Sequence, residues 1–163
     1  MPATETQPAT IGTLLREENV RLGLEATDKT ALIRDLVTSL STESKSNLEE
    51  VADAVLERER RLSTGVGYGV ALPHAKTPAM ETTEVMMAVL AEPLDFDSFD
   101  GDPVRLVFLM VGPPSASRQH IQMLGRVSRI LNDESTRKKL LAAETAAEVV
   151  SIFVTAEGKL SNR

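Results

Sequence analysis

His74 is the residue in this sequence best suited to chemistry at neutral pH. It follows Leu72 and Pro73 in the stretch GVGYGVALPHAK, which runs from Gly65 to Lys76. An imidazole titrates near neutrality, and one ring nitrogen can attack phosphorus while a hydrogen bond holds the other. Pro73 fixes a backbone dihedral and removes a donor, which favours a rigid presentation of the ring. Taken alone, the pattern also fits a turn histidine with no role.

Three spaced glycines, at positions 65, 67 and 69, precede this histidine. Gly67 and Gly69 are candidates for a loop that binds phosphate through its backbone amides, because glycine lets the backbone approach an anion closely. The spacing matches neither the GxGxxG pattern before a helix nor a P-loop. A flexible turn is the simpler interpretation, and both interpretations stay open.

Two further side chains could contact a phosphoryl group. His120 lies near the start of an expected helix, where the helix N-terminus attracts anions. Arg58 is one of three arginines that end an earlier expected helix, and a guanidinium can pair bidentately with phosphate oxygens. The alternatives are a surface histidine and an arginine that only complements the helix dipole. Two histidines without a carboxylate cluster do not predict a metal site.

The composition excludes several classes of protein. A length of 163 residues suits one domain with a substantial core, and 42% hydrophobic and 26% charged residues are ordinary for a globular chain. The net charge of −6 argues against a general nucleic-acid binder. The absence of cysteine excludes disulfides, thiol catalysis and cysteine-bound metal. No apolar run approaches the roughly 20 residues that span a bilayer, so we expect no membrane insertion and a cytoplasmic location.

Apolar spacing and capping residues predict the elements that position these side chains. A helical turn and a short strand are expected within residues 11–24, and later strands at 70–72, 83–92 and 104–112, the last two joined through a turn at Asp100-Gly101. Helices are expected to begin at capping residues, namely Thr27 or Asp28, Ser46 or Asn47, Ser117, Asp133 and Thr145. The helix after Ser117 is expected to bury Ile121, Leu124, Val127 and Leu131, and the methionines at 86, 87, 110 and 123 are expected to fill the core.

This order of helices, strands and helices predicts an α/β fold, with a single domain built on a mixed β-sheet flanked by helices on both faces. We expect residues 1–10 to form a mobile polar leader, because they lack the basic and apolar regions of a signal peptide. Residues 11–157 are expected to form the domain, and residues 158–163 a C-terminal tail.

Taken together, these residues resemble the motifs of a known protein family. The stretch ERERRLSTGVGYGVALPHAK resembles the active-site region of the phosphotransferase-system EIIA domains of the fructose/mannitol type, which include the nitrogen-regulatory EIIA proteins. The stretch SRQHIQMLGRVSRILNDES is similar to the second histidine segment of that family, and the resemblance runs from Ile11 to Glu157. It implies a mixed sheet flanked by helices, in agreement with the expectation from the elements.

The resemblance also implies roles for the candidate residues. His74 would accept the phosphoryl group, His120 would lie beside it and assist, and Arg58 would help to neutralise the phosphate. The donor would be the histidine phosphocarrier protein, and no metal, nucleotide or other cofactor would be needed. The protein would be a phosphotransferase component with a phosphohistidine intermediate.

Two roles for such a carrier differ in what happens to the phosphate. In a regulatory role, like that of the nitrogen-regulatory EIIA proteins, a target protein reads the phosphorylation state. In sugar uptake, a standalone EIIA passes the phosphate to an EIIB domain. The stretch LSTGVGYGVALPH resembles the nitrogen-regulatory and fructose branches more than the mannitol branch, which favours regulation as the first hypothesis. A histidine-dependent hydrolase is disfavoured because no serine or cysteine nucleophile motif is present.

Overall fold

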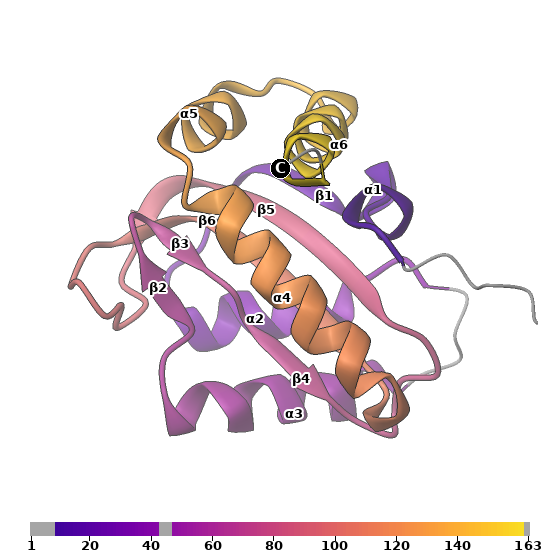
Figure 1. The fold of residues 1–163 in the computed structure, drawn as a ribbon. Coiled ribbons are helices and arrows are strands. Elements are labelled where there is room, and N and C mark those ends of the chain that lie inside the picture. Colours follow the sequence, from indigo (N-terminus) through magenta and orange to yellow (C-terminus); the bar gives the residue numbers. More distant parts are fainter. Residues whose placement is uncertain (1–8, 43–46, 162–163) are drawn as a thin grey trace, which may run out of the picture.

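A computed structural model describes residues 9–42 and 47–161, and within these ranges helices precede and follow a run of strands that belong to one sheet (Figure 1). The helices are α1 (Ile11–Leu14), α2 (Lys29–Thr38), α3 (Leu48–Arg61), α4 (Ser117–Leu131), α5 (Glu134–Ala142) and α6 (Ala146–Ser161). The strands are β1 (Val20–Leu24), β2 (Gly65–Gly67), β3 (Val70–Ala71), β4 (His74–Lys76), β5 (Glu84–Leu94) and β6 (Val104–Gly112). Short 3-10 turns at Glu17–Asn19 and Pro114–Ala116 precede β1 and α4.

The sheet is mixed, as the sequence predicts. Its six strands follow the order β1-β5-β6-β3-β2, and β4 pairs with β6 beyond the end of β3. The long central pair of β5 and β6 is antiparallel, whereas β1 on β5 and both β3 and β4 on β6 are parallel. The two central strands are buried along most of their length, which explains their nearly continuous apolar sequences.

Helices cover both faces of the sheet (Figure 1). On one face, α2 and α3 pack on a core that includes Val107, Leu109 and Val111 of β6. On the other face, α1, α4, α5 and α6 pack on a second core that includes Leu106, Phe108 and Met110. The alternation of neighbouring β6 residues between the two cores follows from the two-residue period of a strand. The predicted fold class, with helices on both faces of a mixed sheet, is confirmed.

Capping side chains set the start of most helices. Asp28, Asn47 and Asp133 each accept a hydrogen bond from a backbone amide in the first turn of the helix that follows, and Thr145 does so for α6. Such caps satisfy amides that have no partner within the helix. Ser46, the alternative cap for α3, lies outside the described residues.

Two expectations about α4 need correction. Ser117 does not cap α4: it is the first residue of the helix, and its hydroxyl donates to the carbonyl of Pro114. Ile121 is 65% exposed and Leu124 is only partly buried. Val127 and Leu131 are buried as expected, and α4 also buries His120. The four methionines expected in the core, at 86, 87, 110 and 123, are all buried.

The ends of the chain depart from the expected boundaries. The predicted tail from residue 158 is helical, since α6 continues to Ser161. Residues 1–8 of the predicted leader lie outside the described residues, and Thr10 caps α1. In the described part of the chain, no helix combines the length and the apolar character needed to cross a membrane.

A buried carboxylate fastens the first helix to the last. Glu157 of α6 accepts hydrogen bonds from the backbone amides of Ile11 and Gly12, at 2.9 and 3.3 Å, and pairs with Arg126 of α4 at 3.0 Å. Because α1 has a single turn, its amides depend on partners from outside the helix. Glu157 therefore joins three helices at the end of the chain.

Candidate functional site

The site lies at an edge of the sheet, where the chain pairs with β6 twice in succession. Val70 and Ala71 of β3 pair with β6, the chain leaves the ladder at Leu72 and Pro73, and β4 rejoins β6 from His74 onward. Proline has no amide to donate and is tolerated at such an edge, while its carbonyl still accepts from the amide of Met110 at 3.1 Å. Sequence reasoning missed β4, because three residues after a proline carry almost no strand pattern. His74 thus sits on a strand and is half-buried.

A hydrogen bond to the backbone orients the His74 ring. Nδ1 lies 2.7 Å from the carbonyl oxygen of Leu72. A carbonyl oxygen only accepts hydrogen bonds, so Nδ1 must carry the proton. In the neutral ring the lone pair is then on Nε2. The bond to Leu72 thereby leaves Nε2 as the ring nitrogen of His74 that is able to act as a nucleophile.

His120 reaches the same place from the first turns of α4. The ring centroids of His120 and His74 lie 5.5 Å apart, with an angle of 57° between the planes. His120 is 2% exposed, which excludes a surface histidine. Among the described residues, neither of its ring nitrogens has a hydrogen-bond partner. A buried polar group without a partner costs about 1–3 kcal/mol. A ligand that accepts a hydrogen bond from this ring would therefore recover part of that free energy.

Burial keeps both rings neutral. It lowers the pKa of His74, against the opposing effect of the bond to Leu72, and the charge of Arg58 lowers this pKa further. Burial also lowers the pKa of His120 to about 4, with smaller contributions from the positive charge that His74 carries when it is protonated and from that of Lys76. At pH 7 the site therefore holds two neutral imidazoles side by side, and each can donate one hydrogen bond and has one nitrogen with a free lone pair.

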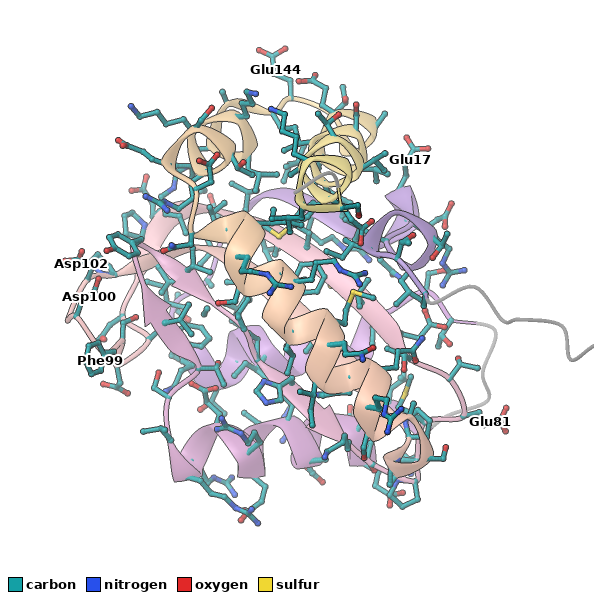
Figure 2. All side chains as sticks on the ribbon, in the orientation of Figure 1. Glu17, Glu81, Phe99, Asp100, Asp102 and Glu144 are labelled. Carbon is teal, nitrogen blue, oxygen red and sulfur yellow. The ribbon has the colours of Figure 1, made fainter. Side chains whose placement is uncertain are left out.

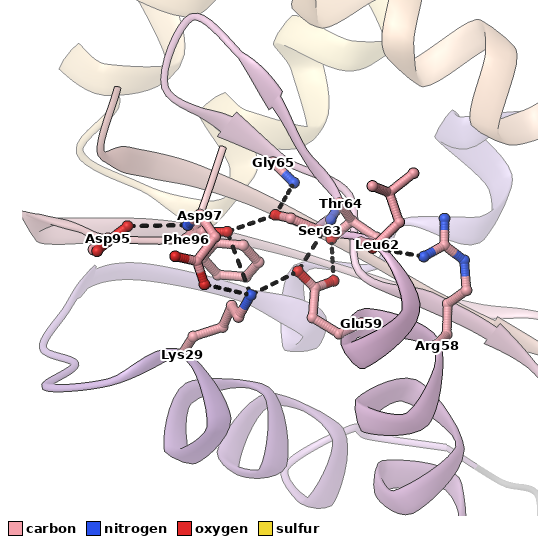
Figure 3. Close-up of polar contacts among 10 residues, drawn as sticks. All are labelled: Lys29, Arg58, Glu59, Leu62, Ser63, Thr64, Gly65, Asp95, Phe96 and Asp97. Atoms are coloured by element: carbon pink, nitrogen blue, oxygen red, sulfur yellow. Dashed lines mark hydrogen bonds and ion pairs between the residues drawn. The ribbon is translucent and has the colours of Figure 1, made fainter. Parts of the chain in front are cut away.

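Arg58 supplies positive charge from α3. One guanidinium nitrogen, Nη1, donates to the carbonyl oxygen of Leu62 at 2.8 Å, just beyond the end of the helix (Figure 3). This bond places the side chain along the helix end, and its charge is felt at His74. A guanidinium has five N–H donors, so the bond to Leu62 leaves others free for an anion. The structure thus brings His74 and His120 together, and it places the charge of Arg58 near enough to lower the pKa of His74.

The comparison with known families now identifies the chain. The model of the phosphoenolpyruvate-dependent sugar phosphotransferase system EIIA 2 family matches residues 13–155. The chain belongs to this EIIA family. As a member of this family, it is a component of the phosphotransferase system.

Relatives of this EIIA chain include both regulatory and sugar-specific proteins. A nitrogen regulatory protein of Bradyrhizobium diazoefficiens is 36% identical over 86% of this chain and 92% of its own length. A fructose-specific EIIA component of the phosphotransferase system of Haloferax volcanii is 43% identical over 62% of this chain and 66% of its own length.

Solved structures show the same fold. The nitrogen regulatory protein IIA-Ntr from Neisseria meningitidis superposes with a TM-score of 0.84 at 30% identity, covering 88% of this chain and 98% of that one. The mannitol enzyme IIA of Escherichia coli, solved in complex with phosphorylated enzyme IIB, superposes with a TM-score of 0.74 at 26% identity, covering 86% and 97%.

The glycines of this EIIA domain form the turn between β2 and β3. Gly67 and Gly69 have positive φ angles of 104° and 77°, and the amide of Tyr68 between them donates to the carboxylate of Asp100 at 2.9 Å. Figure 2 shows Asp100 on the loop at the edge of the molecule. A carboxylate on this turn disfavours a second anion there.

The strand register also separates the glycine turn from His74. Val70 pairs with Leu106 and His74 pairs with Met110 on β6. At about 3.3 Å per residue, the turn before Val70 lies roughly 13 Å or more along β6 from His74. This geometry favours the interpretation as a hairpin turn. Contact between these amides and a phosphoryl group on His74 stays a prediction.

A buried acid near the site escaped the sequence reasoning. Glu59 follows Arg58 and is 5% exposed. A signal was present, because position 59 continues the apolar stripe of Ala52, Val55 and Leu56 at helical spacing. A carboxylate on such a stripe needs buried partners. The partners of Glu59 come from α2 and from the segment after α3.

Proposed function

We propose that the chain is a phosphoryl carrier of the phosphoenolpyruvate-dependent phosphotransferase system that accepts phosphate on Nε2 of His74. The observation that carries the proposal is the bond from Nδ1 of His74 to the carbonyl of Leu72, which leaves a lone pair on Nε2 of a neutral ring. The buried His120 ring, without a hydrogen-bond partner among the described residues, supports a place for the phosphoryl group beside it.

The proposed donor is the phosphohistidine of the histidine phosphocarrier protein. The Nε2 lone pair of His74 attacks phosphorus, a new N–P bond forms, and the N–P bond of the donor breaks with its electron pair returning to the donor ring. The proton on Nδ1 stays in place, so the transfer needs no general base. Catalysis then consists of positioning and of stabilising the negative charge on the three phosphoryl oxygens.

Arg58 and His120 are the proposed sources of that stabilisation. Arg58 has donors left beyond its bond to Leu62, and a charged donor to phosphate is stronger than a neutral one. His120 donates through one ring nitrogen while neutral, and its affinity for the oxygens increases once the added charge favours protonation. No metal ion or organic cofactor takes part in the proposed step.

We propose a regulatory role, in which a target protein distinguishes the phosphorylated from the free form. The nitrogen regulatory relatives in Bradyrhizobium and Neisseria, each aligned over most of this chain, support it. The second candidate is sugar uptake, with an EIIB domain as the acceptor. The fructose-specific relative in Haloferax and the complex of mannitol enzyme IIA with phosphorylated IIB favour this candidate.

Reconstitution tests the carrier function. The chain is incubated with enzyme I, the phosphocarrier and phosphoenolpyruvate labelled on phosphorus. We expect one acid-labile, base-stable label, lost in His74→Ala and kept in His120→Ala, which is the matched control because these are the two histidines of the chain. Undiminished labelling of His74→Ala would overturn the proposal, and so would an acid-stable label.

The same mixture separates the two roles when a candidate EIIB is added. Rapid passage of the label from His74 to EIIB supports sugar uptake. Retention of the label, together with a phosphorylation-dependent change in affinity for a regulatory target, supports the regulatory role.

A further inference from the structure

Glu59 is the centre of a buried polar network behind the site (Figure 3). Its Oε1 accepts from the amide of Thr64 at 3.0 Å, and its Oε2 accepts from the hydroxyl of the same residue at 2.6 Å. Lys29 donates to Oε1 at 3.2 Å. Both carboxylate oxygens are therefore used, and the charge is matched by a cation, as burial of an acid requires.

Lys29 connects this acid to the neighbouring elements. From the start of α2, its ammonium group also lies 3.4 Å from the carbonyl oxygen of Phe96 and 3.4 Å from the carboxylate of Asp97, and 5.3 Å from the centre of the Phe96 ring. Ser63 donates to the same Phe96 carbonyl at 2.5 Å. The network thus ties α2, α3, the segment after α3 and the loop after β5 into one unit.

A continuous set of hydrogen bonds leads from Glu59 to the nucleophile. Glu59 holds Thr64 by two bonds, and the carbonyl of Thr64 accepts from the amide of Leu72 at 3.0 Å. The carbonyl of Leu72 in turn accepts from Nδ1 of His74 at 2.7 Å. Thr64 and Leu72 are thus each held through the amide, and each accepts the next bond at its own carbonyl, in the following peptide group.

The same segment also positions Arg58, the proposed source of positive charge. The carbonyl that holds Arg58 belongs to Leu62, two residues before Thr64. A rotation of the peptide groups between these residues would move that carbonyl and would also displace Thr64, whose carbonyl holds the amide of Leu72. The segment 62–64 therefore sets the positions of two side chains that approach the phosphoryl group from different elements.

We infer that Glu59 is a positioning residue for His74. It holds the segment 62–64, and through Thr64 and Leu72 it keeps the proton of His74 on Nδ1 and the lone pair on Nε2. An imidazole without this restraint exchanges between its two tautomers and rotates, so the reactive nitrogen faces the phosphoryl donor for less of the time. The inference rests on the proposed function for its effect on transfer, but the tautomer of His74 can be measured without any transfer.

A pair of substitutions at Thr64 tests the inference with little change in volume. Thr64→Val removes the hydroxyl that donates to Glu59, and Thr64→Ser keeps it. Glu59→Gln removes the charge that pairs with Lys29. Glu49→Gln is the control, because Glu49 lies on the same helix but pairs with Arg34 at the surface.

Two readouts are needed, since a purely structural residue would change stability alone. The first is the ¹⁵N NMR spectrum of the His74 ring, which reports the fraction of Nδ1–H tautomer. The second is the rate of phosphoryl transfer at 25 °C, with circular dichroism to verify that each variant is folded. We expect Thr64→Val and Glu59→Gln to lose part of the Nδ1–H population and to slow transfer by about tenfold or more. Thr64→Ser and Glu49→Gln should match the wild type.

Each outcome decides the question. An unchanged tautomer and rate in folded Thr64→Val overturns the inference, and so do equal losses in Thr64→Val and Thr64→Ser, because the hydroxyl would then be irrelevant. If Glu59→Gln fails to fold, the Thr64 pair still gives the answer. If the wild-type chain takes no label on His74, the proposed function fails, while the NMR comparison still supports or overturns the positioning role.

Discussion

The rings of His74 and His120 lie 5.5 Å apart between centroids, and they come from different layers of the fold, a strand at the sheet edge and the first turns of α4. One ring has its orientation set by the backbone, and the other has no hydrogen-bond partner among the described residues. An arrangement with one restrained and one unsatisfied imidazole suits a group that arrives on the first and is bound by the second.

Phosphorylation of His74 should raise the pKa of His120 from its value of about 4, because a nearby dianion favours the charged ring. Histidine NMR titrations of the free and phosphorylated protein measure the change. His120→Ala should still take label on His74, but more slowly, or it should lose the label faster. If the pKa of His120 is unchanged by phosphorylation and His120→Ala has wild-type kinetics, His120 has no role in binding the phosphoryl group.

The low pKa of His120 also predicts how stability depends on pH. In the unfolded chain the ring takes up a proton near pH 6.5, whereas in the folded chain it does so at about 4. Between these values the unfolded state binds more protons, so the contribution is complete above pH 6.5 and is lost as the pH falls to about 4. The full shift corresponds to at most about 3 kcal/mol. Urea unfolding from pH 7 to pH 4 should show a smaller decline in His120→Gln than in the wild type, and equal declines would contradict this account.

Arg58→Ala should slow phosphoryl transfer by roughly a hundredfold without preventing eventual labelling of His74, since loss of one donor to developing charge costs about 3 kcal/mol. It should also raise the pKa of His74, because the guanidinium charge lowers it. The matched control is Arg60→Ala, two residues along the same helix, where the side chain is 72% exposed and pairs with Glu57. Equal rates for the two variants would reduce Arg58 to a helix-end cation.

Local sequence patterns predict the elements of this protein well where one pattern dominates. The central strands are long apolar runs, and Asp28, Asn47 and Asp133 are strong caps, so these elements match the expectations. The small strands β2 and β4 could not be predicted in this way, since each has three residues and exists only because β3 or β6 provides a partner.

The features of the site also differ in whether local sequence patterns predict them. The motif around His74 indicates the nucleophile, but the tautomer depends on the Leu72 carbonyl, which lies where the chain leaves the β6 ladder between Ala71 and His74. The contact with His120 depends on how α4 packs across the sheet, and Ile121, which the apolar spacing places in the core, points outward as a result. Tertiary packing determines these features, and they cannot be predicted from the local spacing of apolar residues.

Glu157→Ala should destabilise the protein by about 3 kcal/mol, because it leaves the amides of Ile11 and Gly12 without acceptors and Arg126 without its buried partner. Glu157→Gln should cost less, since an amide oxygen can still accept from one of these amides. Glu144→Ala is the control: Glu144 is exposed, and its side chain extends outward from the end of the molecule in Figure 2.

Urea unfolding at pH 7 measures these three variants, and the rate of phosphoryl transfer provides the second comparison. Glu157 joins α1, α4 and α6 and has no hydrogen bond to the site residues among the described contacts. Glu157→Ala should therefore keep near-normal transfer at temperatures where it is folded. Equal stability of Glu157→Ala and Glu144→Ala would show that the bonds from Glu157 to α1 add nothing to folding, and slow transfer in the folded variant would show that this end of the molecule is coupled to His74.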